Sequence, residues 1–287
     1  MSTDLDTAVR MAKACDVAYS IGAPGGITSS RYYDNVGFTS EPNAFAAAII
    51  NAALVGTTGS EVILAFRGTL RIDTDNWDEF VESVQDWAND GAVKLVDVSY
   101  TAGLVHQGFQ RSLDLLWPDL IDAVRSQQTA SKLPVIVTGH SKGGALASLA
   151  AMRLQNETGI SPCVYTFASP RAGNTQFARD YNAKLPKSWR FENSDDLVPH
   201  LPPTVLLLDF LAEADPRFAG LSAHDYHHVG LLEFMDWGGT IVEGSSLLLD
   251  AQRLTHLAEL GTTGQIQKVA EDHSLDGQYI PKLSARL

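Results

Sequence analysis

The sequence predicts an α/β fold with a mostly parallel central sheet and helices on both faces. Short apolar runs rich in β-branched residues, such as EVILAF (61–66) and CVYTFA (163–168), alternate with segments whose apolar residues have helical spacing. Neither an internal repeat nor a low-complexity linker divides the 287 residues. Together these observations predict one domain over residues 1–287.

The first predicted element is an amphipathic helix over residues 4–19, where apolar residues recur at helical spacing. Residues 21–35 are rich in Gly, Ser and Tyr and predict a loop. The apolar stretch 44–55 is expected to form a strand, and a Gly-Thr-Thr-Gly turn separates it from residues 61–66. Because that second run is apolar throughout, it suits a central strand covered on both faces.

The middle of the chain starts with an acidic, tryptophan-bearing stretch at about residues 70–90, which we interpret as a lid-like insert. A strand is expected over 93–98 and a helix over 106–124. Within that helix, Pro118 predicts a kink or a new helix start. The next segment runs from an apolar strand beginning at Val135 into a small-residue helix that ends near Leu154.

The second half continues the same alternation. Strands are expected over 163–168 and 189–192, an edge strand over 226–230, helices over 174–182 and 247–260, and a loop with a last helix over 272–283. A hydrophobic stretch at about residues 204–223 is interpreted as a second possible cap segment.

Composition excludes several classes of function. The net charge of −13 repels nucleic acid and anionic membrane surfaces, so we expect no nucleic-acid partner. No run approaches the length of a membrane span, and the acidic N-terminus lacks the features of a signal peptide. This predicts a cytoplasmic protein, although a secreted form that had lost its leader would look the same. Cys15 and Cys163 form no metal or disulfide pattern and are expected to be buried, inert thiols.

The strongest chemical signal is Gly139-His140-Ser141-Lys142-Gly143, which lies between a predicted strand and a predicted helix. This G-x-S-x-G pattern is typical of a nucleophile elbow, in which glycines flank a crowded bend and the serine hydroxyl is exposed. The alternative is a glycine-rich turn whose serine only caps the helix. A serine nucleophile requires a base and an orienting acid elsewhere in the chain.

Candidates for those partners lie downstream of Ser141. Asp195 and Asp196 both follow the predicted strand 189–192, where open α/β sheets place their sites. The later histidines considered as the base are His224, His227, His228, His256 and His273. His256 falls in a helical pattern and is expected at the surface, whereas His273 lies in a polar loop of the kind that carries function. The cluster at 224–228 resembles a metal site only weakly, because no further ligand pattern accompanies it.

An oxyanion hole requires two donors directed at the developing negative charge. The backbone N–H of Lys142, directly after the serine, is one candidate. The Gly68-Thr69 turn after the strand 61–66 is the other, and Thr69 offers both its amide and its hydroxyl. The alternative for this turn is an ordinary strand ending.

These segments resemble the class 3 (fungal-type) lipases of the α/β-hydrolase superfamily. The matching segments are FRGT (66–69), VHQGF (105–109), TGHSKGG (138–144), FASPRAGN (167–174), DLVPHLPP (196–203), YHHVG (226–230) and DHSL (272–275). The resemblance implies an α/β-hydrolase fold and places His228 in a structural strand. It also implies site residues: Ser141 as nucleophile, Asp196 as acid, His273 as base, and Thr69 and Lys142 as the oxyanion hole.

The implied function is serine carboxylic ester hydrolysis of acylglycerols or short- to medium-chain esters, with no cofactor and no metal. Feruloyl-type ester cleavage, acyl transfer and a non-catalytic hydrolase-fold binding module remain the alternatives. The expected partner is a small-molecule or lipid ester, with transient contact to a lipid interface through the lid. The insert after Thr69 is longer and more acidic than in the simplest family pattern, and the disulfides of secreted fungal members cannot form with two cysteines.

Overall fold

An eight-stranded sheet organises the protein in a computed structural model that describes residues 4–22, 26–27, 30–48, 51–69, 94–203, 225–265 and 267–287. The strand order is β1-β2-β3-β6-β7-β8-β9-β10. Strands β3, β6, β7, β8 and β9 are parallel, and the outer strands pair antiparallel. The strands are β1 (Asn43–Ala47), β2 (Asn51–Thr57), β3 (Val62–Phe66), β6 (Val135–His140), β7 (Cys163–Phe167), β8 (Ser188–Asn193), β9 (Leu231–Met235) and β10 (Ile241–Glu243).

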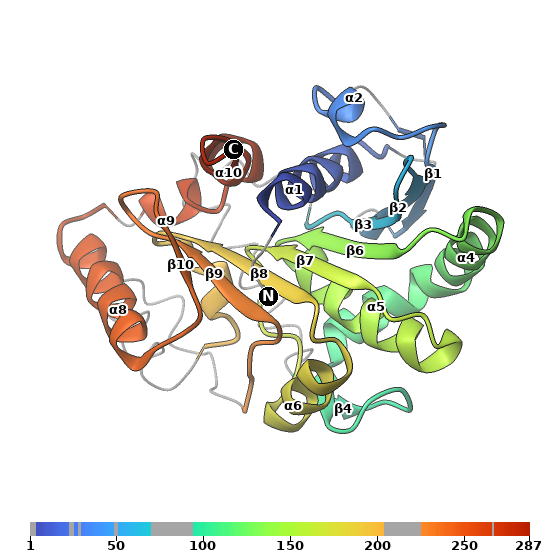
Figure 1. Ribbon diagram of the computed structural model, residues 1–287. Coiled ribbons are helices and arrows are strands. Elements are labelled where there is room, and N and C mark those ends of the chain that lie inside the picture. Colours follow the sequence, from blue (N-terminus) through green and yellow to red (C-terminus); the bar gives the residue numbers. More distant parts are fainter. Residues whose placement is uncertain are drawn as a thin grey trace.

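Helices cover both faces of this sheet, which confirms the predicted fold class (Figure 1). Helices α1 and α10 lie on one face and α4, α5 and α6 on the other, while α8 lies beside the β9–β10 edge. The helices are α1 (Leu5–Tyr19), α2 (Tyr33–Val36), α4 (Gln107–Ser131), α5 (Lys142–Thr158), α6 (Thr175–Lys184), α8 (Leu247–Thr262), α9 (Lys268–Glu271) and α10 (Ile280–Ser284), with a 3₁₀ turn η1 (Val198–His200) and a π-helical turn η3 (Leu275–Tyr279).

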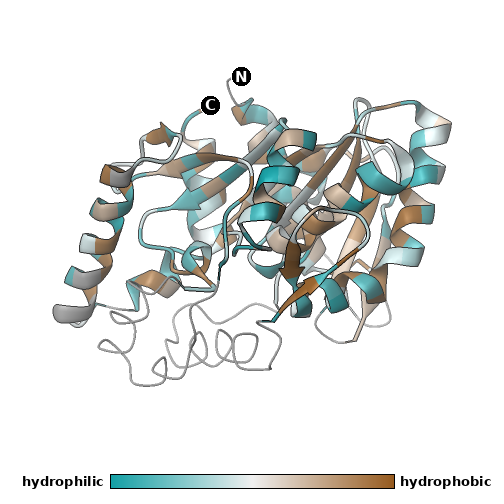
Figure 2. Cartoon of the chain, turned by 90° about the horizontal axis from the view of Figure 1, so that it is seen from below, coloured by the Kyte–Doolittle hydropathy of each residue, from teal (hydrophilic) through white to brown (hydrophobic). Residues whose placement is uncertain are grey.

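The two faces of the sheet carry separate hydrophobic clusters. Alternate residues of β3 belong to different clusters. Leu64 and Phe66 face the cluster with α4 and α5, whereas Ile63 and Ala65 face the cluster with α1 and α10. Figure 2 shows hydrophobic colouring along the strands and mixed colouring on the helices. The unbroken apolar run of this strand therefore reflects burial on both faces, as predicted.

Two strand predictions are wrong. Residues 44–55, expected as one strand, form the antiparallel hairpin of β1 and β2, in which Asn43 pairs with Val55. No glycine or proline signals the reversal, although Ala48 adopts a positive φ of 44° there. The edge strand expected over 226–230 is absent; His227 makes only an isolated bridge to Gly173, and β9 begins at Leu231.

The expected break at Pro118 is also wrong, since α4 continues through it for 25 residues. Pro118 is exposed, and so is Asp114, whose carbonyl loses its helical partner to the proline. Water can hydrate that carbonyl, while Trp117 and Leu120 on the opposite side bury against the core. The strand expected over 93–98 is shorter, β4 (Leu95–Asp97), and pairs with β5 (Leu104–His106) in a separate two-stranded sheet.

The lid-like insert at 70–90 and the cap segment at 204–223 lie outside the described residues. The single-domain prediction for residues 1–287 includes both stretches and stays a prediction. In the described ranges, no helix has the length and apolarity that crossing a membrane requires.

Candidate active site

Ser141 lies on a strained bend between β6 and α5. Its φ of 57° and ψ of −133° are unfavourable for a residue with a side chain. The bend also requires glycine on each side: a Cβ at Gly139 would lie 2.0 Å from the Gly143 oxygen, and one at Gly143 would lie 2.5 Å from the Phe66 oxygen. The G-x-S-x-G spacing is therefore a steric requirement of this turn.

Three residues that the sequence singles out are brought together by hydrogen bonds. His273 Nε2 lies 3.0 Å from Ser141 Oγ, and His273 Nδ1 lies 3.0 and 3.1 Å from the two oxygens of Asp196. All three side chains are buried. The arrangement is that of a serine, a base and an orienting acid.

The Asp196 carboxylate is held by two further donors. The Val198 N–H donates to Oδ1 at 2.9 Å, and the Tyr279 hydroxyl donates to Oδ2 at 2.8 Å. Burial, with the Asp196 charge next in effect, raises the pKa of Tyr279 well above its usual value, so the phenol keeps its proton. An anionic Asp196 facing Nδ1 favours the tautomer that carries the proton there, which leaves Nε2 free to accept from Ser141.

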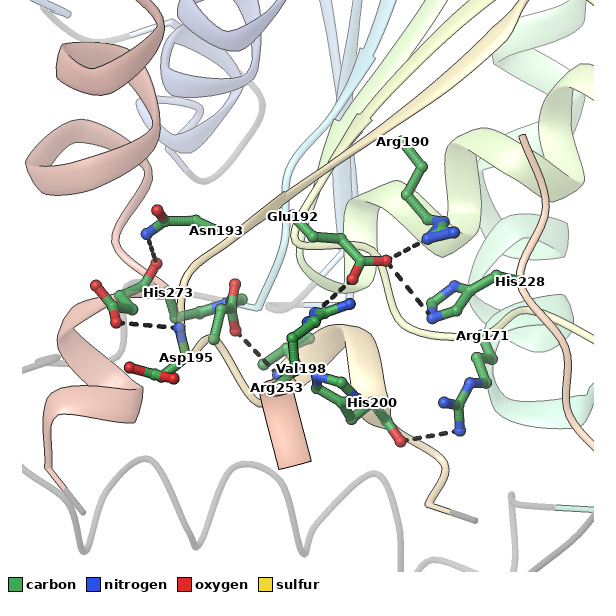
Figure 3. Close-up of polar contacts among 12 residues, drawn as sticks. Arg171, Arg190, Glu192, Asn193, Asp195, Val198, His200, His228, Arg253 and His273 are labelled. Carbon is green, nitrogen blue, oxygen red and sulfur yellow. Dashed lines mark hydrogen bonds and ion pairs between the residues drawn. The ribbon is translucent and has the colours of Figure 1, made fainter. Parts of the chain in front are cut away.

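The backbone around His273 is fixed from two sides. His140 Nε2 lies 3.0 Å from the His273 carbonyl oxygen, and the Tyr19 hydroxyl lies 2.8 Å from His140 Nδ1. Burial lowers the pKa of His140 well below its usual value, so this imidazole stays neutral and can donate from Nε2 while accepting at Nδ1. Asn193 Nδ2 donates to the Asp272 carbonyl at 2.8 Å, a contact visible in Figure 3.

Asp195, the other candidate acid, points away from His273. Its Oδ1 accepts from Trp237 Nε1 at 2.9 Å, and its Oδ2 lies 3.7 Å from Lys268 Nζ. Its backbone N–H donates to Asp272 Oδ2 at 3.2 Å. Trp237 in turn stacks on His256 of α8, with ring centroids 3.8 Å apart. His256, expected at the surface, is 41% exposed and forms part of this contact.

The predicted oxyanion residues lie on either side of the elbow, Thr69 in the turn after β3 and Lys142 at the start of α5. The β3–β6 register pairs Phe66 with Gly139, which brings the turn after β3 against Ser141. A Cβ on Gly68 would lie 2.9 Å from the Ser141 Cβ, and the half-buried Thr69 follows directly. As the first residue of α5, Lys142 has an N–H without an acceptor inside that helix. Its side chain is also buried, and Nζ donates to Asn51 Oδ1 at 2.9 Å.

The histidine cluster at 224–228 does not assemble a metal site from its described members. His228 lies before β9 rather than in a strand, which corrects the expectation drawn from the family resemblance. Its Nε2 lies 3.6 Å from Glu192 Oε1, whereas His227 lies near Thr175. His224 lies outside the described residues, and no group of potential metal ligands occurs within them.

Several residues around the site escaped the sequence analysis. Tyr279 and Tyr19 carry no local motif, and their spacing along the chain reveals nothing of their contacts. Asp272 lies in the DHSL segment, but its sequence context assigned it no role. His140 is inside the G-x-S-x-G motif, but only the structure shows that its Nε2 contacts the His273 carbonyl oxygen. Cys163, expected to be buried, is half-buried, while Cys15 is fully buried as expected.

Comparison with known proteins identifies relatives among lipases. The family described as Lipase (class 3) matches residues 63–206, half of the chain. A lipase of Caenorhabditis elegans is 40% identical over 119 residues, which cover 40% of this chain and 33% of the relative. A secreted mono- and diacylglycerol lipase of Fusarium solani is 31% identical over 173 residues, covering 55% of this chain and 48% of the relative. The matched part thus spans between a third and a half of these relatives.

Solved structures match over more of the chain. A mutant of MDLA from Penicillium cyclopium superposes with a TM-score of 0.63 at 24% identity, covering 88% of both chains. Lipase II of Rhizopus niveus gives a TM-score of 0.63 at 24% identity, covering 80% of both. At these identities the likeness establishes the fold alone.

Proposed function

The chain belongs to the class 3 lipase family, and on that premise we propose that it is a serine hydrolase of acylglycerols or short- to medium-chain carboxylic esters. The observation that carries the proposal is the unbroken hydrogen-bonded chain from Ser141 through His273 to Asp196. A hydroxyl, a base and a buried acid in this order are what acyl transfer through a serine requires.

In the proposed mechanism, Ser141 Oγ attacks the ester carbonyl while His273 Nε2 accepts its proton. Asp196 holds the imidazole and stabilises the imidazolium that forms. The backbone N–H groups of Lys142 and Thr69 donate to the tetrahedral oxyanion, and loss of one such donor costs about 3–4 kcal/mol. His273 then protonates the leaving alcohol, and a water attacks the acyl-enzyme with His273 again as the base.

The substrate class is supported by the relatives and by charge. One relative is named a mono- and diacylglycerol lipase, which favours neutral glycerides. The net charge of −13 disfavours anionic phospholipid surfaces. We therefore expect faster turnover of tributyrin and p-nitrophenyl butyrate than of phosphatidylglycerol. Faster turnover of the anionic lipid would contradict this substrate class.

The test of the proposed nucleophile is Ser141→Ala, assayed on p-nitrophenyl butyrate beside the wild type. We expect the variant to lose at least a thousandfold in kcat and to lose labelling by a fluorophosphonate probe. Ser112→Ala, a buried serine on α4, is the matched control and should keep both. Full turnover by Ser141→Ala would refute the assignment, and a wild type that never labels would favour the binding-module alternative.

A panel of feruloyl esters and acceptor alcohols separates the enzymatic alternatives. Feruloyl ester cleavage faster than butyrate cleavage, or acyl transfer to alcohol faster than hydrolysis, would replace the lipase assignment. Contact with a lipid interface and the cytoplasmic location stay predictions; two relatives are named as secreted proteins. Cell fractionation with immunodetection tests the location.

A further inference from the structure

A cavity of about 620 Å³ lies on the face of β8 that carries Arg190 and Glu192, and none of Ser141, Asp196 and His273 lines it. Its wall is formed by the alternate β8 residues Arg190 and Glu192, by residues 226–230 before β9, and by α8. Phe191, between the two, faces the cluster with α1 and α10 instead. The exposed residues Asn182, Ser245 and Asp250 line it as well, so it is open to solvent. The volume falls within the range of about 300–1,000 Å³ typical of small-molecule sites.

Two arginines of the cavity share one carboxylate. Arg190 pairs with Glu192 Oε1, and Arg253 Nη2 lies 2.6 Å from Oε2 (Figure 3). These arginines lower the pKa of Glu192 to about 2 against the effect of burial, so it is ionised under all ordinary conditions. The charge of Glu192 balances only one of the two guanidinium groups.

A third arginine has no acidic partner in the described part of the chain. Arg171 Nη1 donates to the carbonyl oxygens of His200 at 3.1 Å and Pro202 at 2.8 Å. Burial lowers the pKa of Arg171 to about 10, which leaves it protonated near neutral pH. In addition, Arg253 Nε has no hydrogen-bond acceptor among the described atoms although its residue is only 4% exposed.

The lining therefore carries a positive excess. Among the described residues of the wall, three arginines face Glu192 and the exposed Asp250, which leaves one positive charge in a protein whose net charge is −13. Two of the histidines at the wall, His200 and His228, respond to the same charges. Burial, followed by the charge of an arginine, lowers the pKa of His200 and of His228 well below the usual value.

We propose that this cavity binds the phosphate group of a small phosphate monoester or of inorganic phosphate, with Arg171 and Arg253 as its main donors. Guanidinium groups match the geometry of an oxyanion and bind it with paired, charge-assisted hydrogen bonds. The cavity is much larger than one phosphate, and polar residues such as Asn182 and Ser245 line it, which suits the hydroxyl groups of an attached polyol. The site is separate from Ser141 and does not depend on the proposed ester hydrolysis.

The test is calorimetric titration of the wild-type protein with inorganic phosphate and with glycerol 3-phosphate at constant ionic strength. We expect saturable binding with one site, a millimolar or lower Kd, and tighter binding of the glycerol ester. At a tenfold excess over Kd, the melting temperature should rise by about 3 °C, whereas equivalent chloride should not raise it. Absence of saturable phosphate binding to the wild type would overturn the proposal.

Variants assign the binding to this cavity. Arg171→Gln should weaken phosphate binding at least tenfold, and Arg171→Lys, which keeps the charge without the fork, should weaken it less. Arg111→Gln removes the same charge from an exposed position on α4 and should bind as the wild type does. Circular dichroism checks that each variant is folded. If Arg171→Gln does not fold, the test rests on Arg171→Lys, which should still bind phosphate more weakly than the wild type. Equal weakening by Arg111→Gln would show a diffuse electrostatic effect and refute the site.

Vesicles distinguish the source of the phosphate group. Phosphatidylcholine vesicles with and without one-fifth phosphatidic acid are titrated with the Ser141→Ala protein, which cannot consume lipid in the proposed mechanism. Binding of phosphatidic acid that Arg171→Gln abolishes would indicate a lipid headgroup. Binding of glycerol 3-phosphate without vesicle binding would indicate a soluble ester; both outcomes keep the phosphate site.

Discussion

Replacing Asp272 by Asn should stabilise the protein at neutral and alkaline pH. Asp272 directly precedes His273 and is only 3% exposed. Its Oδ2 accepts from the Asp195 N–H at 3.2 Å, and its Oδ1 lies 3.9 Å from Lys282 Nζ. Burial raises the pKa of this carboxyl from 3.8 to about 6, an effect that the charge of Lys282 opposes without cancelling.

The magnitude follows from the two pKa values. The folded protein binds the Asp272 proton more tightly than the unfolded chain does, so the free energy of unfolding falls as pH rises from about 4 to about 6. A difference of about two pKa units corresponds to about 3 kcal/mol, all of it lost above pH 6. Asn keeps an oxygen to accept from the Asp195 N–H but does not titrate. The variant should therefore exceed the wild type by about 2–3 kcal/mol at pH 8 and by less than about 1 kcal/mol below pH 4.

The assay is urea unfolding followed by circular dichroism at several pH values between 3.5 and 8. Asp119→Asn, an exposed aspartate on α4, is the matched control and should follow the wild type throughout. The reasoning fails if Asp272→Asn is less stable than the wild type at pH 8. It also fails if the advantage is the same at pH 4 and pH 8, because titration of this carboxyl is then not its cause.

Two further predictions concern the residues around Ser141. Tyr279→Phe removes the hydroxyl that donates to Asp196 at 2.8 Å. Because a hydrogen bond to a charged group contributes about 1.5–3 kcal/mol, we expect kcat on p-nitrophenyl butyrate to fall about tenfold with KM unchanged. An unchanged kcat would show that Asp196 needs no such donor. Gly68→Ala places a Cβ 2.3 Å from the Tyr19 hydroxyl and 2.9 Å from the His140 oxygen, so the turn must move away from Ser141. We expect it to lose about a hundredfold in kcat with native circular dichroism, and full activity would exclude this turn from the oxyanion hole.

The sheet was predictable where burial alone determines the sequence. A strand covered on both faces must be apolar at every position, and residues 61–66 and 163–168 meet that condition. The prediction failed where tertiary contacts replaced a local signal. The β1–β2 hairpin reverses without glycine or proline, and Pro118 remains inside α4 because its side of the helix faces water.

The residues of the site likewise divide into those that the sequence predicts and those that it does not. The elbow was predictable because its steric demands act on residues two positions from Ser141, where only glycine fits. The partners of Ser141 were harder, since Asp195 and Asp196 are equivalent by position after β8 and only the family resemblance separated them. Tyr279 was not predictable at all, because nothing near it in the sequence indicates that its hydroxyl reaches Asp196.

The two adjacent aspartates, Asp195 and Asp196, have different partners that the sequence alone does not indicate. Both are buried, yet Asp196 accepts from His273 and Asp195 accepts from Trp237, because neighbouring residues of the turn point in different directions. Trp237, in the turn between β9 and β10, stacks on His256 of α8 and donates to Asp195, so α8, which no active-site motif marks, is joined to the loop that carries the acid. Asp272 completes the connection by accepting from the Asp195 backbone one residue before His273. Contacts therefore run from α8 through Trp237 and Asp195 to the neighbours of Asp196 and His273, and the surroundings of the acid and the base include a segment that the G-x-S-x-G motif does not contain.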